Sequence, residues 1–192
     1  MSFNKKLMNI WVYNGVQVIS VNVLAPLVLA LVVKKLPSGE KRESKKLSVG
    51  EIIKVCFIMV GVGLALGFIS DRLVVLLSTL IGSEVSKTAS EVEDLRSICI
   101  TIFTTVIAAP IAEEIMFRKI VLNKIRQYGD KIAIFTTAIM FGLFHGNVSQ
   151  LIYAVPLGAI LAYVALKTGT IKYTIMMHMS MNLVGGVITP LL

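Results

Sequence analysis

The sequence predicts an all-α fold, a polytopic transmembrane bundle of about six helices. Of its 192 residues, 56% are hydrophobic, and the mean hydropathy of +0.83 is too high for a domain whose whole surface is solvated by water. Lysines and arginines lie in short clusters between long, uncharged apolar runs. These features are typical of a chain that crosses a membrane several times.

Six apolar runs are candidate spans, because a helix needs about 20 mainly apolar residues to cross the hydrocarbon layer. They cover residues 9–33, 52–69, 97–115, 132–144, 151–166 and 173–191. The fourth run is short by this measure. The second has an apolar continuation beyond Asp71 and Arg72 that fits a helix at the membrane interface.

The distribution of basic residues predicts how the spans are oriented. The loops after the first, third and fifth runs, counted with Lys54 at the edge of the first loop, hold 14 of the 19 basic residues, and the opposite side holds 5. Short cytoplasmic loops are rich in lysine and arginine, so these three loops are expected in the cytoplasm and the N-terminus outside. Topology thus explains the net charge of +8, and no binding to nucleic acid is expected.

No internal repeat or long linker divides the chain, so one membrane domain is expected. Within it, residues 1–97 would supply the N-terminal spans and a basic cytoplasmic loop, and residues 98–192 the catalytic core. The loop KKLPSGEKRESKK, residues 34–46, is expected to be a mobile, solvated connection that faces lipid headgroups. Cys56 and Cys99 lack the spacing of a zinc site or of a disulfide framework, which indicates packing residues.

A few ionisable side chains interrupt the apolar runs. Each costs about 2.5 to 3.5 kcal/mol to insert at the centre of a membrane helix, so such residues usually face the bundle interior and have a function or a partner. Glu113 and Glu114 end the third run, while the chain's two histidines, His145 and His178, end the fourth run and lie in the sixth. Three pairs spaced by four residues share a helix face: Glu114 and Arg118, Phe141 and His145, and His178 and Asn182.

Helix geometry predicts that two of these groups meet. If the third run continues to a turn at Gly129, Glu113 precedes that glycine by 16 residues and His145 follows it by 16. An antiparallel hairpin would therefore set both side chains at one level.

The depths predicted for Glu113 and His178 also agree. Counted from Arg118 and Lys172 as markers of the cytoplasmic interface, both lie about 7 to 9 Å inside it at 1.5 Å per residue. The fourth run is then too short to cross unless the chain bends near Gly146.

Each group alone has a plainer interpretation. The Glu114 and Arg118 pair could be a helix-stabilising ion pair, either histidine could be a core residue bonded to a carbonyl, and Phe141 is typical of packing. Two carboxylates, two histidines and an amide at one membrane level are hard to explain by packing. Their conjunction indicates a site.

The residue types favour chemistry with water. Two adjacent carboxylates cannot both be ionised cheaply at low dielectric, but Arg118 can stabilise Glu114 as the anion. Glu113 is then available as a general base, and His145 could share the water with it.

The sixth run supplies hydrogen-bond donors. His178 and Asn182 present two donors from one helix face, which suits the oxyanion that forms on an attacked carbonyl. Pro110 has no amide hydrogen and leaves the Val106 carbonyl without its helical donor, so we expect a kink that opens space beside Glu113.

Three motifs in the C-terminal half of the chain resemble those of one family of membrane enzymes. They are EEIMFR at 113–118, FGLFH at 141–145 and HMSMN at 178–182. They correspond to the EExxxR, FxxxH and HxxxN patterns of the CAAX protease and bacteriocin-processing family (Abi or CPBP), intramembrane endopeptidases related to the type II CAAX prenyl endopeptidases. The resemblance covers about residues 98–187.

The resemblance implies a helical bundle whose site opens towards the cytoplasm and hydrolyses a peptide bond in a membrane-associated peptide or protein. The chain is then expected to be a multi-pass protein of the cell membrane, in a bacterium by its residue usage. The implied roles are water activation by Glu113 and His145, oxyanion stabilisation by His178 and Asn182, and support by Glu114, Arg118 and Phe141.

No cofactor is favoured, although zinc is possible. Glu113, His145 and His178 are residue types that bind zinc, and members of the family are commonly called metalloproteases. The sequence has no HExxH motif, however, and Asn182 is a poor zinc ligand, so hydrolysis without a metal is preferred.

Two other functions stay open at this point. A non-catalytic bacteriocin immunity or scaffold protein would bind a partner through the same bundle. A proton-coupled transporter would also place glutamate and histidine inside the membrane.

Overall fold

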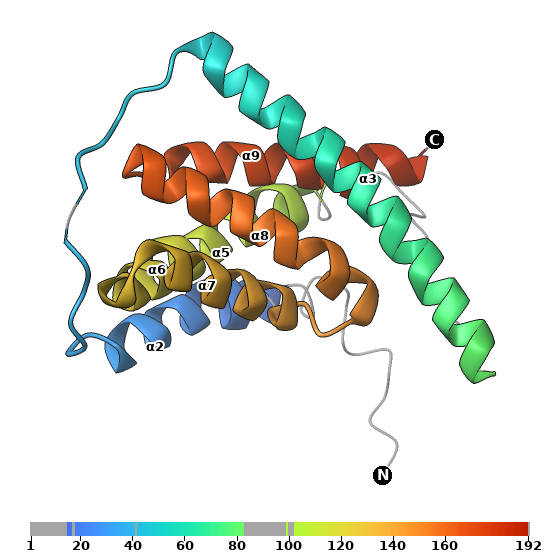
Figure 1. Ribbon diagram of the computed structural model, residues 1–192, viewed down its shortest axis with the longest axis horizontal. Coiled ribbons are helices and arrows are strands. Elements are labelled where there is room, and N and C mark those ends of the chain that lie inside the picture. Colours follow the sequence, from blue (N-terminus) through green and yellow to red (C-terminus); the bar gives the residue numbers. More distant parts are fainter. Residues whose placement is uncertain (1–14, 17, 41, 83–98, 100–101, 192) are drawn as a thin grey trace.

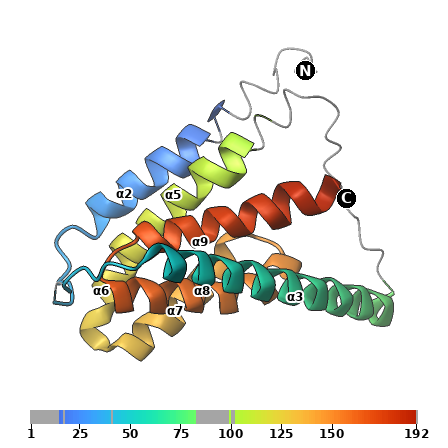
Figure 2. The same cartoon turned by 90° about the horizontal axis from the view of Figure 1, so that it is seen from above.

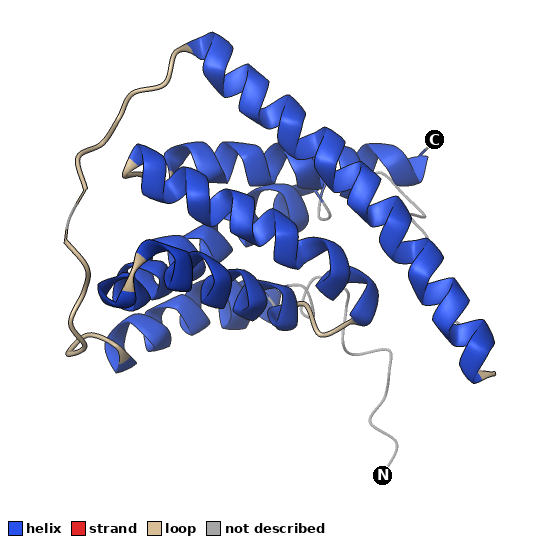
Figure 3. Ribbon diagram, in the orientation of Figure 1, coloured by secondary structure: helices blue, strands red, loops and turns tan. Residues whose placement is uncertain are grey.

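The computed structural model describes residues 15, 16, 18–40, 42–82, 99 and 102–191, and every regular element in these ranges is helical (Figure 3). The all-α prediction is confirmed. Lys5, Lys6, residues 83–98 and the boundary between residues 97 and 98 lie outside the described residues. The outward N-terminus and the division of the chain at that boundary therefore stay predictions.

Six helical runs make up the described chain, as many as the sequence predicts (Figure 1). The simple α-helices are α3 (Val49–Ile81), α7 (Asp130–Phe144) and α8 (Val148–Thr168). The composite runs, in which η marks π or 3₁₀ geometry, are η1 (Val18–Leu24) with α2 (Ala25–Val32); η2 (Ile102–Ala108), α5 (Ala109–Glu113), η3 (Glu114–Val121), α6 (Leu122–Ile125) and η4 (Arg126–Tyr128); and α9 (Lys172–Leu183), η5 (Val184–Ile188) and η6 (Thr189–Leu191).

Two of the described helices, α3 and α8, are long and apolar enough to cross a membrane. α3 has 33 residues and continues unbroken through Asp71 and Arg72 to Ile81, so the apolar continuation is part of the same helix. At 1.5 Å per residue it is about 50 Å long, against about 30 Å for a hydrocarbon core. Only 11% of its most apolar window is buried, and a surface of this kind suits lipid better than water. Beyond these two helices, the number of spans stays a prediction.

Local sequence sets the ends of both long helices. Ser48 caps α3 in a reciprocal pair with Glu51, each side chain bonding the other residue's amide. Asn147 caps α8 by accepting the Gln150 amide at 2.7 Å. α8 ends at Gly169, whose φ of 64° is a left-handed conformation that glycine adopts without strain.

The helices approach closely where their residues are small. A Cβ on Gly158 of α8 would lie 3.0 Å from Phe141 Cδ1 and 3.3 Å from Ala138 Cα of α7, so glycine here lets the two helices touch. α3 crosses α8 and α9 diagonally (Figure 1). From above, α9 lies between α3 and the pair formed by α2 and α5 (Figure 2). The junction of α5 and η3, the end of α7 and α9 thus surround a common centre.

The described part of the loop between α2 and α3, residues 33–40 and 42–48 and here called the strap, lies along one end of the bundle (Figure 1). Its amides at Gly39 and Lys45 donate to the carbonyls of Asn123 and Thr168, each at 2.8 Å. The expected solvated connection is therefore hydrogen-bonded to two other helical runs, because its backbone is extended and can pair with carbonyls left open at helix ends.

The strap also brings the three basic loops together. Its Arg42 guanidinium donates to the Leu166 carbonyl at 2.9 Å and pairs with Asp130. Further along, the Leu47 amide donates to the Tyr173 hydroxyl at 2.9 Å. The loops predicted to share one side of the membrane thus lie at one end of the molecule, and the assignment of that end to the cytoplasm stays a prediction.

We expect Gly169→Ala to destabilise the protein. The left-handed conformation costs alanine about 1 to 2 kcal/mol, and its Cβ would collide with the Glu43 carbonyl of the strap. The thermal midpoint in detergent, followed by circular dichroism, should fall by about 4 to 8 °C. Gly67→Ala is the control, because Gly67 is helical and a Cβ there meets nothing within 4 Å. An equal midpoint for both variants would contradict the role of the strap contact.

Candidate active site

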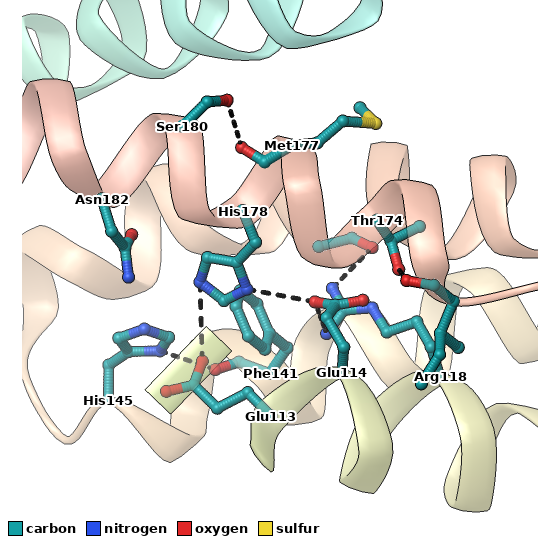
Figure 4. A network of polar contacts seen from close by, with 12 residues as sticks. Glu113, Glu114, Arg118, Phe141, His145, Thr174, Met177, His178, Ser180 and Asn182 are labelled. Atoms are coloured by element: carbon teal, nitrogen blue, oxygen red, sulfur yellow. Dashed lines mark hydrogen bonds and ion pairs between the residues drawn. The ribbon is translucent and has the colours of Figure 1, made fainter. Parts of the chain in front are cut away.

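The predicted site residues meet at the centre of the bundle (Figure 4). Glu113 and Glu114 lie at the junction of α5 and η3, His178 and Asn182 on α9, and His145 just after α7. The hairpin expectation is confirmed in its main point, since the chain turns at Gly129, with φ 111°, between η4 and α7. Three segments far apart in the sequence thus contribute to one cluster.

A buried ion pair anchors the cluster. The side chains of Glu114 and Arg118 are both 0% exposed, with Arg118 Nη1 3.4 Å from Glu114 Oε1. The guanidinium also donates through Nη2 to the Gly158 carbonyl at 3.2 Å and lies 4.3 Å above the centre of the Phe141 ring. A charge pair with these contacts can remain in an apolar interior because each charge is compensated locally.

Taking Arg118 as a marker of the membrane interface was wrong. Its side chain lies fully inside the bundle, because the carboxylate, a carbonyl and an aromatic face replace the water that an interface would offer. The depth of Glu113 counted from Arg118 therefore has no basis. The level of Glu113 follows instead from its contact with α9.

Both histidines are anchored through Nδ1. His145 Nδ1 lies 2.8 Å from the Phe141 carbonyl oxygen, which can only accept, so this nitrogen carries the hydrogen. His178 Nδ1 lies 3.1 Å from Glu114 Oε1, and a carboxylate likewise accepts. The Nε2 atom of each ring is left for the site, and that of His178 lies 3.8 Å from Glu113 Oε2.

Phe141 is the wall that orients the two imidazoles. Its ring centre lies 4.9 Å from that of His145 and 5.6 Å from that of His178, both nearly perpendicular to it. The packing role that its residue type indicated is therefore correct, and the packing holds site residues.

Glu113 is the least restrained member of the cluster. Its side chain is 12% exposed, and its Oε2 atom has no hydrogen-bond partner among the described residues. Figure 4 shows its carboxylate pointing into the same space as the His145 ring and the Asn182 amide. A polar molecule beside these residues would therefore meet a carboxylate oxygen that has no hydrogen-bond partner among the described residues.

The end of α7 shows how the chain continues after the short fourth run, and whether this run crosses the membrane stays a prediction. The helix stops at Phe144, His145 follows as its C-cap, Gly146 turns the chain with φ 70°, and Asn147 starts the next helix. The bend predicted near Gly146 is confirmed. It leaves His145 at a helix end, half-buried, with its ring facing the cluster.

Pro110 lies where the helix changes its geometry, and the expected kink stays a prediction. α5 lies between two π-helical segments, η2 and η3, and π geometry widens a helix by one residue per turn. In the i to i+5 pattern the Thr105 carbonyl would pair with the amide of residue 110, which proline lacks. Asn182 Nδ2 donates to this carbonyl instead, at 2.9 Å.

The sequence did not indicate Thr105 or Gly158 as part of the site. Both contribute only a backbone carbonyl, to Asn182 and Arg118 respectively, and side-chain motifs carry no information on such contacts. The available signal was indirect: a proline five residues after Thr105, and a glycine in the middle of an apolar helix.

A preformed metal site does not fit these residues. Within the described ranges, no three His, Cys, Asp or Glu side chains are grouped closely enough to hold a metal ion. The Glu113, His145 and His178 set considered for zinc is therefore not arranged as a ligand set, and the choice between chemistry with and without a metal stays a prediction.

We expect Arg118→Met to cost about 3 to 5 kcal/mol of unfolding free energy, because it leaves the buried Glu114 charge without its partner. Glu114→Gln combined with Arg118→Met should cost less than the sum of the two single changes, with a coupling of about 1 to 3 kcal/mol. Unfolding in mixed micelles would measure all three variants. Arg72→Met is the control on an exposed helix face, and a similar small cost for Arg118→Met would contradict the role of the pair.

Asn182→Leu should cost about 1 to 3 kcal/mol, because it leaves the Thr105 carbonyl without a donor. In a Pro110→Ala background the cost should be smaller, since the new amide at position 110 can donate to the same carbonyl. The unfolding free energies of the four proteins form the test. Equal costs in the two backgrounds would show that Asn182 does not replace the missing helical donor.

The part of the chain that contains the site matches a known protein family. Residues 95–184, which contain all three motifs, match the family described as "Type II CAAX prenyl endopeptidase Rce1-like". The chain is also similar to a protein of Bacillus subtilis (strain 168) named "Putative membrane peptidase YdiL", with 27% identity over 103 residues, and it covers 42% of that relative's length and 53% of its own. No solved structure matches significantly. The resemblance inferred from the three motifs is thereby confirmed, since residues 95–184 match the model of the Rce1-like, type II CAAX prenyl endopeptidase family.

Proposed function

We propose that this protein is an intramembrane endopeptidase that hydrolyses a peptide bond of a membrane-associated peptide or protein. The observation that carries the proposal is the Glu113 carboxylate, whose Oε2 atom has no hydrogen-bond partner among the described residues and lies 3.8 Å from an imidazole whose other nitrogen is anchored to a buried carboxylate. The family match and the name of the Bacillus relative support a membrane protease, and the apolar helices α3 and α8 support a location in the membrane.

The charges of the cluster support distinct roles for the two glutamates. Glu114 is balanced by Arg118, so it stays an anion and holds His178 Nδ1 as a donor. If His178 is an imidazolium, the cluster of two carboxylates and two cations is neutral as a whole. Its Nε2 then also carries a hydrogen, which points towards Glu113 and the space beside it.

In the proposed reaction, Glu113 removes a proton from a water molecule as the water oxygen attacks the peptide carbonyl carbon. The Nε2 lone pair of neutral His145 accepts the second hydrogen of that water and orients it. The carbonyl electrons move to oxygen, and the resulting oxyanion accepts hydrogen bonds from His178 Nε2 and from the Asn182 amide hydrogen that does not bond Thr105. When the oxyanion collapses, the carbon–nitrogen bond breaks and the amine leaves with the proton held by Glu113.

This reaction uses no metal, in line with the chemistry preferred from the sequence. The site would belong to a multi-pass protein of a bacterial cytoplasmic membrane, with the strap end in the cytoplasm as the basic loops predict. The half-buried positions of Glu113 and His145 support entry of the substrate from the side of the cluster away from Arg118.

We expect Glu113→Gln to lower cleavage by about 100-fold or more, because general-base catalysis contributes about 10² to 10⁴. The change keeps the shape of the side chain, so insertion and thermal midpoint should stay the same. Because the substrate is unidentified, the measurement is a comparison of peptide termini in membrane fractions from cells that produce wild type or variant. Glu40→Gln, on the exposed strap, is the matched control.

Termini that depend on wild type and on Glu40→Gln, but vanish with Glu113→Gln, would support the protease. Cells whose membrane termini are unchanged by Glu113→Gln would contradict it and favour a binding protein. Loss of the same termini on chelation would contradict the metal-free step while leaving the protease in place.

A further inference from the structure

A second feature of the molecule lies on the strap end and has no part in the proposed reaction. A cavity of about 1070 Å³ opens between the run of η1 and α2, the strap, η3 with α6, and the turn from α8 to α9. Leu27 and Ala30 of α2 and Ile115 and Ile120 of η3 contribute apolar walls. It is large enough for part of a lipid and too apolar along its walls for a purely polar ligand.

The charges that line this cavity are all positive. Its basic residues in the described part of the chain are Lys34, Arg42, Arg118, Lys119, Lys124 and Arg126, and no described aspartate or glutamate belongs to its lining. Arg42 and Arg126 are paired with Asp130 just outside it. Lys34, Lys119 and Lys124 form no ion pair with any described residue, but Lys124 Nζ already donates to the Leu36 carbonyl. The exposed Lys34 and Lys119 therefore remain for an anionic ligand.

We propose that this cavity binds one anionic phospholipid, with the headgroup phosphate at Lys34 and Lys119 and an acyl chain along Leu27 and Ala30. Basic pockets between membrane helices bind anionic headgroups, and the cytoplasmic leaflet supplies them. A soluble anion would use the cations and leave the apolar walls uncovered. The acyl chain of a zwitterionic lipid would also contact the apolar walls, but its headgroup has no net charge, so the lysines would attract it less.

The test is native mass spectrometry of the full chain in detergent with phosphatidylglycerol, or phosphatidylcholine of the same acyl chains. Wild type should retain one phosphatidylglycerol, and Lys34→Gln with Lys119→Gln should weaken its binding about 10- to 30-fold. The control is Lys131→Gln with Lys172→Gln, which removes the same charge from exposed residues at the same end that do not line the cavity. Equal losses in both double variants, or equal retention of phosphatidylcholine, would overturn the proposal.

Two further experiments test whether the cavity is the binding site. Ala30→Trp keeps every cation but fills part of the apolar wall, so it should also lower retention of phosphatidylglycerol. Unchanged retention would overturn the cavity as the binding site. Release of the lipid by millimolar inorganic phosphate would likewise assign the cations to a soluble anion. None of these readouts depends on protease activity, so the proposed function and this inference can fail separately.

Discussion

The buried ion pair of Glu114 and Arg118 is the constraint on which the centre of the molecule depends. Each charge needs the other because no water reaches either side chain. The pair in turn fixes its neighbours: Glu114 holds the His178 ring through Nδ1, and Arg118 reaches across to the Gly158 carbonyl of α8. Three helical runs are thus joined by one polar network in an otherwise apolar interior, which is a strong reason for them to adopt one arrangement.

The pair also explains how the adjacent Glu113 can be left open. Two neighbouring carboxylates at low dielectric would repel one another unless a cation neutralised one of them. With Arg118 and the His178 ring beside Glu114, the second carboxylate can stay without a hydrogen bond, with His178 Nε2 3.8 Å from its Oε2 atom. Glu113, the proposed base, and Glu114, the member of the structural ion pair, are therefore successive residues of one helical run. Their side chains point in different directions because a helix turns by about 100° per residue.

Much of this arrangement could be predicted from residue types and spacing. The polar residues of the apolar runs meet as expected, because burying them separately would cost more than burying them together. The burial of Arg118 could not be predicted. In the sequence, a cation near the end of an apolar run looks the same whether its side chain faces water or a buried carboxylate. The contacts of Thr105 and Gly158 were also hidden, because any residue carries the same backbone carbonyl. The strap was misjudged for a related reason: its composition is polar, and composition does not report which backbone amides find acceptors.

The π-helical segments around α5 have a consequence for how this site can change. A π-helical turn contains about one residue more than an α-helical turn, so it behaves like an insertion that the helix has absorbed. A change of one residue in the length of η2 that no change of helix geometry compensates would rotate everything before it by about 100° relative to Glu113 and Glu114. The carbonyl of Thr105 would then turn away from Asn182. The helical phase of this run is therefore part of the site, and the chain tolerates exchange of side chains in η2 more readily than any change in its length.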